Sequence, residues 1–153
     1  MTTGQNHCDP LESLEKAGLQ KTIQRIVVLR AVIRADRPIT AAEIYEDLDV
    51  AERVNKVTVY RVLASLEEAG IVRGIPTVDG MNYYEMACSH NPLHAHFYCR
   101  YCRAMTCLGP LGEEICQNLY PSCRHEADAL SVSITGLCND CRRNKTKRKE
   151  EPL

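Results

Sequence analysis

The sequence predicts a protein of the α+β class, with a mainly helical N-terminal half that ends in a β-hairpin and a smaller C-terminal half of strands and one helix. Apolar residues recur at helical spacing up to about residue 69 and in strand-like patterns in much of the remainder. Two Cys-x-x-Cys motifs enclose much of the second half. A unit of about 50 residues is close to the size that needs a metal ion or a partner subunit for stability.

Capping residues and apolar spacing predict four helices in the N-terminal half. Thr40 and Glu43 have the spacing of a capping box, in which each side chain bonds the other residue's backbone amide. In the last of the four helices, Val59, Val62, Leu63 and Leu66 form one apolar stripe that should face a core. The predicted helices cover about residues 10–17, 22–35, 40–49 and 56–69.

A β-hairpin is predicted after these helices. Residues 70–86 contain two strand-like segments joined by Asp79-Gly80, a dipeptide suited to a two-residue turn. Three helices followed by such a ribbon indicate a winged helix-turn-helix, with the short first helix as an extension. A small helical domain with a hairpin and no role in DNA binding is the alternative.

The C-terminal half is predicted to be a small α+β domain over residues 94–141, after a DNA-binding domain over 1–87 and a linker over 88–93. Leu130, Val132 and Ile134 alternate with polar residues, which predicts a strand over 130–135 with one buried face. The tail, 142–153, contains the basic run RRNKTKRK and is expected to be disordered and solvated. Two further strands are expected at 94–99 and 104–108, and a helix is expected at about 111–121.

Composition narrows the class of protein. The 153 residues are 44% hydrophobic and 25% charged, which is typical of a globular chain. Apolar runs are too short to cross a bilayer and the first residues do not look like a signal peptide, so no membrane association is expected and the cytoplasm is the expected location. No phosphate loop, G-x-S-x-G or H-E-x-x-H motif occurs, so neither an enzyme nor a small-molecule substrate is expected.

Four cysteines carry the most specific chemical signal. Cys99 and Cys102 form one Cys-x-x-Cys pair, and Cys138 and Cys141 form a second. In a reducing compartment such pairs are more often metal ligands than disulfides, and four thiolates suit a closed, structural Zn²⁺ site. One zinc ion per chain is therefore predicted here, with free or redox-active thiols as the alternative.

His94 and His96 are predicted to belong to a second metal site. Two residues apart on a strand, their side chains point to one face, and the four thiolates already complete the first site. Satisfied polar residues without a metal are the alternative. Candidate co-ligands are Glu85, Cys88, His90, Cys107 and Glu114.

Together these motifs resemble the ferric uptake regulator (Fur) family over nearly the whole chain. The segments that carry the resemblance are KAGLQKTIQR (16–25), ITAAEIYEDL (39–48), VTVYRVLASLEEAGIV (57–72), YE (84–85), HAHFYCRYC (94–102) and GLCNDC (136–141). The resemblance implies a winged-helix DNA-binding domain, a C-terminal dimerisation domain, and repression of metal-uptake or peroxide-response genes when a sensor site is filled.

The resemblance also implies roles for particular residues. It makes Cys99, Cys102, Cys138 and Cys141 the structural zinc ligands. It makes His94 and His96 sensor ligands, and it aligns Glu85 and Cys107 with other sensor ligands of the family. The expected partners are a second copy of the chain and a palindromic, A/T-rich operator DNA, which Thr58, Tyr60 and Arg61 would contact in the major groove.

Departures from the family pattern favour zinc as the sensed metal. Iron and peroxide sensors usually take a ligand from a histidine just before the third helix, where this chain has Pro38. Cys88 resembles the linker cysteine of zinc-sensing members, and position 107, often a carboxylate, is cysteine. Thiolate and imidazole ligands favour Zn²⁺ over Fe²⁺. The prediction is a zinc-responsive, Zur-like repressor; the alternatives are an iron sensor, then a peroxide sensor, or a zinc-stabilised protein-interaction module.

Overall fold

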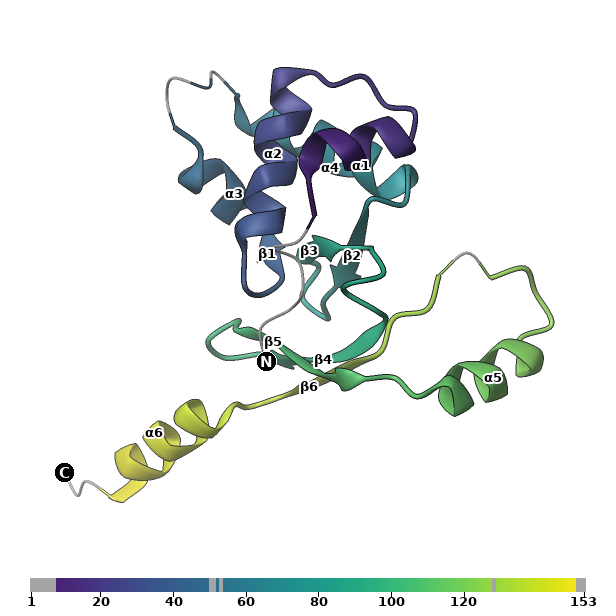
Figure 1. Ribbon diagram of the computed structural model, residues 1–153. Helices are drawn as coiled ribbons and strands as arrows, with labels where there is room; N and C mark the ends of the chain where they lie inside the picture. Colours follow the sequence, from purple (N-terminus) through teal and green to yellow (C-terminus); the bar gives the residue numbers. More distant parts are fainter. Residues whose placement is uncertain (1–7, 50–51, 53, 128, 151–153) are drawn as a thin grey trace. The chain divides into compact units, whose positions relative to one another are not determined.

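The computed structural model describes residues 8–49, 52, 54–127 and 129–150 and divides into two compact units, Met1–Leu93 and His94–Leu153. Each unit is an α+β structure with its own three-stranded sheet (Figure 1). The predicted fold class is therefore confirmed. Among the described residues, none of the helices is both long and apolar enough to cross a membrane.

The first unit packs four helices around one apolar core and beside a small antiparallel sheet. The strand order is β1-β3-β2, and β2 and β3 are the two arms of the predicted hairpin. Fully buried side chains from all four helices meet in the core: Leu14, Leu29, Ile44 and Leu63. The elements are α1 (Pro10–Lys16), α2 (Ile23–Arg34), β1 (Ile39–Thr40), α3 (Ala41–Asp47), α4 (Lys56–Glu68), β2 (Val72–Pro76) and β3 (Asn82–Met86).

The predicted capping box at the start of α3 is present. Thr40 Oγ1 accepts a hydrogen bond from the Glu43 amide at 3.2 Å, and the Glu43 carboxylate accepts one from the Thr40 amide at 2.8 Å. The Glu43 carboxylate also pairs with Arg37 at 2.6 Å. The capping contacts satisfy amides that the first turn of a helix leaves without partners, so they stabilise the start of α3.

A Thr40→Ala substitution is expected to lower the free energy of unfolding of the first unit by about 1 kcal/mol, because it removes the oxygen that caps α3. Urea unfolding followed by helical circular dichroism measures this. Thr40→Ser keeps the oxygen and should retain most of the stability. Equal stability of the alanine variant and the wild type would contradict the capping role.

The segment expected to be a linker, residues 88–93, is hydrogen-bonded to the first unit. Asn91 is buried, and its side-chain amide donates to the Met86 carbonyl oxygen at 2.8 Å. The guanidinium of Arg73, on β2, donates to the carbonyl oxygens of both Met86 and Asn91. Arg73 of the hairpin and Asn91 of the segment itself therefore hold residues 88–93 against the wing.

The second unit is a mixed sheet with strand order β5-β4-β6. β4 (His94–Cys99) pairs antiparallel with β5 (Met105–Pro110) and parallel with β6 (Ser133–Gly136). α5 (Glu113–Ser122) lies in the connection between β5 and β6, and α6 (Asn139–Glu150) follows β6 (Figure 1). The parallel pair requires this long crossover, because two parallel strands cannot be joined by a tight turn.

Two expectations for the second unit differ from the structure. Ile134 is expected on a buried face but is 53% exposed. Two apolar side chains of α5, Ile115 and Leu119, are likewise 45% and 44% exposed. The tail expected to be disordered continues α6 as far as Glu150; residues 151–153 lie outside the described residues. Arginine, lysine and glutamate are good helix formers, so a helix begun by the second Cys-x-x-Cys pair can extend through this basic segment.

Candidate metal centres and DNA-reading helix

The four predicted zinc ligands come together in the second unit. One sulfur from each of Cys99, Cys102, Cys138 and Cys141 lies within 4.8 Å of the others, and we call this group the four-cysteine site. Cys99 ends β4 and Cys102 lies in the β4–β5 turn, whereas the other two residues flank the start of α6. The β4–β6 register brings the two cysteine pairs together: Cys99 lies opposite Gly136, and Gly136 is two residues before Cys138.

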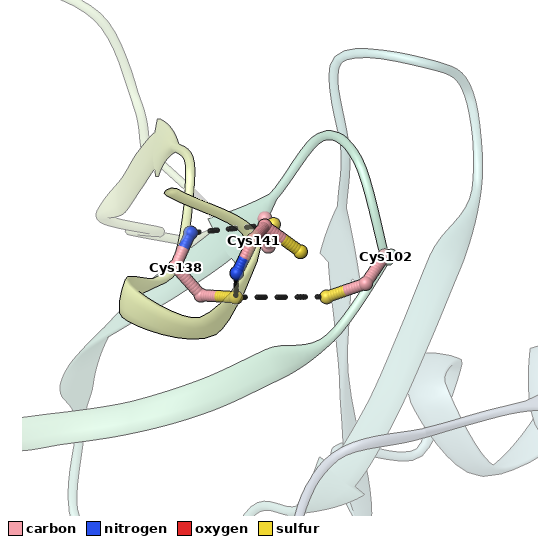
Figure 2. A group of neighbouring side chains, drawn as sticks. Cys102, Cys138 and Cys141 are labelled. Atoms are coloured by element: carbon pink, nitrogen blue, oxygen red, sulfur yellow. Dashed lines mark hydrogen bonds between the residues drawn. The ribbon is translucent and has the colours of Figure 1, made fainter. Parts of the chain in front are cut away.

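Backbone amides surround the sulfurs of this site. The Cys138 amide donates to Cys99 Sγ at 3.4 Å. The Cys141 amide donates to Cys138 Sγ at 3.5 Å (Figure 2). Burial raises the pKa of the Cys99 thiol, but backbone donors from Cys102, Cys138 and Tyr101 outweigh burial and lower that pKa to about 6. Amide donors stabilise a thiolate, which is the protonation state that binds a metal.

The donor set and its dimensions suit zinc. Thiolates about 2.3 Å from a tetrahedral Zn²⁺ lie about 3.8 Å from each other. The sulfurs of Cys102 and Cys138 are 3.8 Å apart and face one another (Figure 2). Four protein ligands leave no open coordination position, so an ion here would be structural.

A second group of metal-ligating side chains lies on the β4–β5 pair. The ring centroids of His94 and His96 are 4.4 Å apart, and both side chains are buried. Cys107 is the cross-strand partner of His96, with a β-bulge between the two histidines. One ligand atom from each of the three residues lies within 4.8 Å of the others. We call His94, His96 and Cys107 the strand cluster.

Glu85 lies on β3, in the first unit, and is 1% exposed. Its carboxylate oxygen lies 3.2 Å from Nε of Arg73, the residue opposite Glu85 across the hairpin. A buried carboxylate needs a compensating charge, and Arg73 supplies one in this unit. The pattern of the sequence did not point to Arg73, because its role depends on the hairpin register.

Cys88 lies in a third group, with Cys8 and His90. One ligand atom from each lies within 4.8 Å of the others, all in the first unit. The two sulfurs are 3.2 Å apart. We call these three residues the Cys8 cluster. No spacing motif could have predicted it, since 80 residues separate Cys8 from Cys88. Of the other suggested co-ligands, Glu114 is exposed on α5 and belongs to none of these three groups.

The helix expected to contact DNA is α4, which follows α3 in the helix-turn-helix. Asn55 caps it, with its side-chain oxygen accepting from the Thr58 amide at 2.8 Å. Tyr60 and Arg61 are exposed and Thr58 is half-buried, whereas Val59 and Val62 on the other face are buried. An exposed first turn with polar and aromatic side chains is what major-groove contact requires.

Comparisons with known proteins agree with the motifs and the fold. The model of the ferric uptake regulator family matches residues 16–109. A ferric uptake regulation protein of Campylobacter upsaliensis is 32% identical over 141 residues, which are 89% of this chain and 88% of the relative.

Two solved structures share the fold. The Vibrio cholerae ferric uptake regulator has a TM-score of 0.67 at 27% identity, over 83% of this chain and 98% of that chain. A zinc uptake regulator in complex with zinc and DNA has a TM-score of 0.63 at 26% identity, over 95% of this chain and 99% of that chain. The family resemblance predicted from the motifs is confirmed, and with it the expectation that the protein is not an enzyme. The chain belongs to the ferric uptake regulator family, whose members are metal-responsive transcription regulators.

Proposed function

We propose that this protein is a repressor of metal homeostasis genes in the cytoplasm that binds operator DNA when Zn²⁺ fills its sensor site. The observation that carries the choice of zinc is the thiol of Cys107 beside two imidazoles in the strand cluster. Thiolate and imidazole are ligands that zinc prefers, whereas a site that combines imidazole with carboxylates is better suited to Fe²⁺.

Two metal ions per chain follow from this proposal. A structural Zn²⁺ occupies the four-cysteine site. A regulatory ion occupies the strand cluster, and Glu85 or Cys88 supplies a further ligand, as the family resemblance implies. Each choice has a cost: Glu85 already neutralises Arg73, so its use as a ligand requires exchange of that ion pair, and Cys88 already lies beside Cys8 and would have to leave that group.

The regulatory ion acts by shifting a conformational equilibrium. Residues 1–87 form the DNA-binding domain and residues 94–141 the dimerisation domain. An ion that takes ligands from both restricts the angle between them, and in a symmetric dimer this sets the spacing of two α4 helices on a palindrome. The ion must bind the DNA-competent arrangement more tightly, since otherwise no population shifts.

A homodimer is supported by apolar side chains that the single chain leaves exposed. Ile115, Leu119 and Tyr120 on α5 and Ile134 on β6 are each at least 44% exposed. Such residues, gathered in one small unit, are typical of a surface that another subunit covers. We assign the second subunit to another copy of this chain.

An iron-responsive regulator is the second candidate. It is favoured by the curated relatives, such as those of Campylobacter upsaliensis and Campylobacter jejuni, which are named ferric uptake regulation proteins. The missing histidine at Pro38 and the thiol of Cys107 weigh against this candidate.

Fluorescence anisotropy with a palindromic A/T-rich duplex distinguishes these functions. Anaerobic protein is titrated with Zn²⁺, Fe²⁺ or Mn²⁺, and a mixed-sequence duplex serves as the control. The proposal predicts tight binding at low free Zn²⁺ and weak binding without it. Binding that only Fe²⁺ induces would establish the iron sensor, and an absence of DNA binding with every metal would favour a protein-interaction module.

Arg61→Ala is expected to weaken operator binding by about 1–3 kcal/mol if Arg61 contacts a base, with relaxed specificity at one position. The measurement is anisotropy against the operator and against single-base variants. Arg124→Ala removes the same charge from an exposed residue of the second unit and should leave affinity unchanged. Full affinity of the Arg61→Ala protein would mean that α4 does not read the operator.

A further inference from the structure

We propose that Cys8, Cys88 and His90 form a third Zn²⁺ site, separate from the four-cysteine site and from the sensor. Three ligand atoms of the residue types that zinc prefers lie within 4.8 Å of one another. All three residues belong to the first unit, whereas the four-cysteine site and the strand cluster lie in the second. The inference does not depend on which metal the protein senses.

Elements of the first unit hold the two thiols on the same core. Cys8 immediately precedes Asp9, which caps α1 by accepting the Glu12 amide at 2.9 Å, and Leu14 of α1 is fully buried. Cys88 follows Ala87, whose amide donates to the Ile71 carbonyl oxygen at 2.9 Å. Both cysteines are half-buried against the core, so their proximity is built into the packing of this unit.

The turn that follows Cys88 places the third ligand. The Asn91 amide donates to the Cys88 carbonyl oxygen at 3.0 Å, which closes a turn that includes His90. Asn91 is itself fixed by its bond to Met86. Cys88 and His90 are therefore presented by one ordered turn, and Cys8 reaches it from a segment 80 residues earlier.

The arrangement fits a zinc ion better than a disulfide. The sulfurs are 3.2 Å apart, against about 2.0 Å in a disulfide and about 3.8 Å between thiolates on one tetrahedral zinc. A disulfide would leave the imidazole of His90 without a function in the cluster. His90 is exposed, so an ion can enter from solvent and keep one coordination position for water.

Zinc binding would change the protonation of Cys8. Burial, together with the neighbouring Cys88 thiol, raises the pKa of Cys8 to about 11 in the metal-free protein. Zinc binds the thiolate, so binding at Cys8 would release a proton to solvent. The bound ion would fasten the start of α1 to the turn after β3. Because α1 has only seven residues, this attachment adds substantially to its stability.

The test counts zinc in anaerobically purified full-length protein, measured by mass spectrometry of metals against a competing chelator. Cys8→Ser is expected to bind one zinc ion fewer than the wild type, and His90→Ala should show the same loss or a much weaker site. Cys123→Ser removes an exposed cysteine outside the three groups and should bind as much zinc as the wild type.

Double substitutions separate this site from the sensor. The Cys8→Ser/Cys88→Ser protein should lose one ion, because both residues hold the same one. The Cys88→Ser/Cys107→Ser protein should lose two. If Cys8→Ser retains all its zinc and the Cys88→Ser/Cys107→Ser pair loses only one ion, Cys88 belongs to the sensor and the third site is disproved. Failure of metal-dependent DNA binding in every protein would refute the repressor function without altering these counts.

Hydrogen exchange provides a second readout. Zinc should slow exchange of the α1 amides in the wild type and leave it unchanged in Cys8→Ser. Equal protection of α1 in both proteins would overturn the proposed attachment.

Discussion

A Cys99→Ser protein is expected to lose the zinc ion of the four-cysteine site and, with it, the folded C-terminal unit. Structural zinc sites contribute about 10–16 kcal/mol of apparent binding free energy at neutral pH, which is as large as the whole stability of most domains. Cys99 is fully buried at the end of β4, and its sulfur accepts the amide of Cys138. The substitution removes a zinc ligand and leaves the backbone amides that donate to the Cys99 sulfur without their thiolate acceptor.

The architecture of the second unit explains why loss of this zinc ion should unfold the whole unit. β6 has only four residues and reaches β4 after a crossover of more than twenty residues. The ion would tie the β4–β5 turn to the start of α6, so it closes the chain around that crossover. Without it, a short parallel pair and an exposed helix have too little buried apolar surface to remain ordered.

Zinc content and sedimentation velocity check this expectation, with circular dichroism as a measure of folding. Cys99→Ser and Cys138→Ser should be zinc-poor at the four-cysteine site and monomeric or aggregated. Cys123→Ser, which changes a cysteine outside the site, should remain dimeric and zinc-loaded. A Cys102→Ser protein that keeps both the dimer and its full zinc content would contradict the assignment.

The elements that the sequence predicted best are those determined by local signals. Capping residues placed α1 to α4 close to their observed bounds, and Asp79-Gly80 placed the hairpin turn. The four-cysteine site was predictable because two Cys-x-x-Cys pairs have few other uses in a reducing compartment. In each case the information lies within a few residues of the feature.

The features that were missed depend on distant residues or on another chain. Ile115 and Leu119 are four residues apart and so lie on one helix face, which favours their burial, but this spacing does not indicate whether the same chain or a second copy covers them. Arg73 meets Glu85 only through the register of the hairpin. Cys8 meets Cys88 only because α1 and the turn after β3 pack on the same core, so no local pattern relates these two thiols.

The charged tail was misjudged for a different reason. Basic composition is compatible with a disordered end and with a helix, because arginine and lysine favour both solvent exposure and helical backbone. What decides between them is the preceding structure. Here the second Cys-x-x-Cys pair flanks the first turn of α6, and the Arg142 amide donates to the Cys138 carbonyl oxygen at 3.0 Å.

His96→Ala is expected to abolish zinc-dependent operator binding while leaving the protein folded. The His96 ring lies 4.4 Å from that of His94, and His96 is the cross-strand partner of Cys107, so its removal takes one of the three ligands from the strand cluster. Loss of a residue that merely supports a ligand costs about 10–100-fold in metal affinity, and loss of a ligand should cost more. Anisotropy at increasing free Zn²⁺ should therefore show a midpoint raised more than about 100-fold.

The identity of the sensed metal is tested most sharply at Cys107. Cys107→Ser should leave the four-cysteine ion in place and the dimer intact, yet weaken the zinc response. Cys107→Asp supplies a carboxylate in place of the thiolate and should shift the metal preference from Zn²⁺ towards Fe²⁺ and Mn²⁺. Both variants are titrated anaerobically with each metal, and zinc at the four-cysteine site is counted in parallel. If both respond to zinc as the wild type does, while His96→Ala and Glu85→Ala destroy a response to Fe²⁺, the thiol is not a sensor ligand and the protein is an iron sensor.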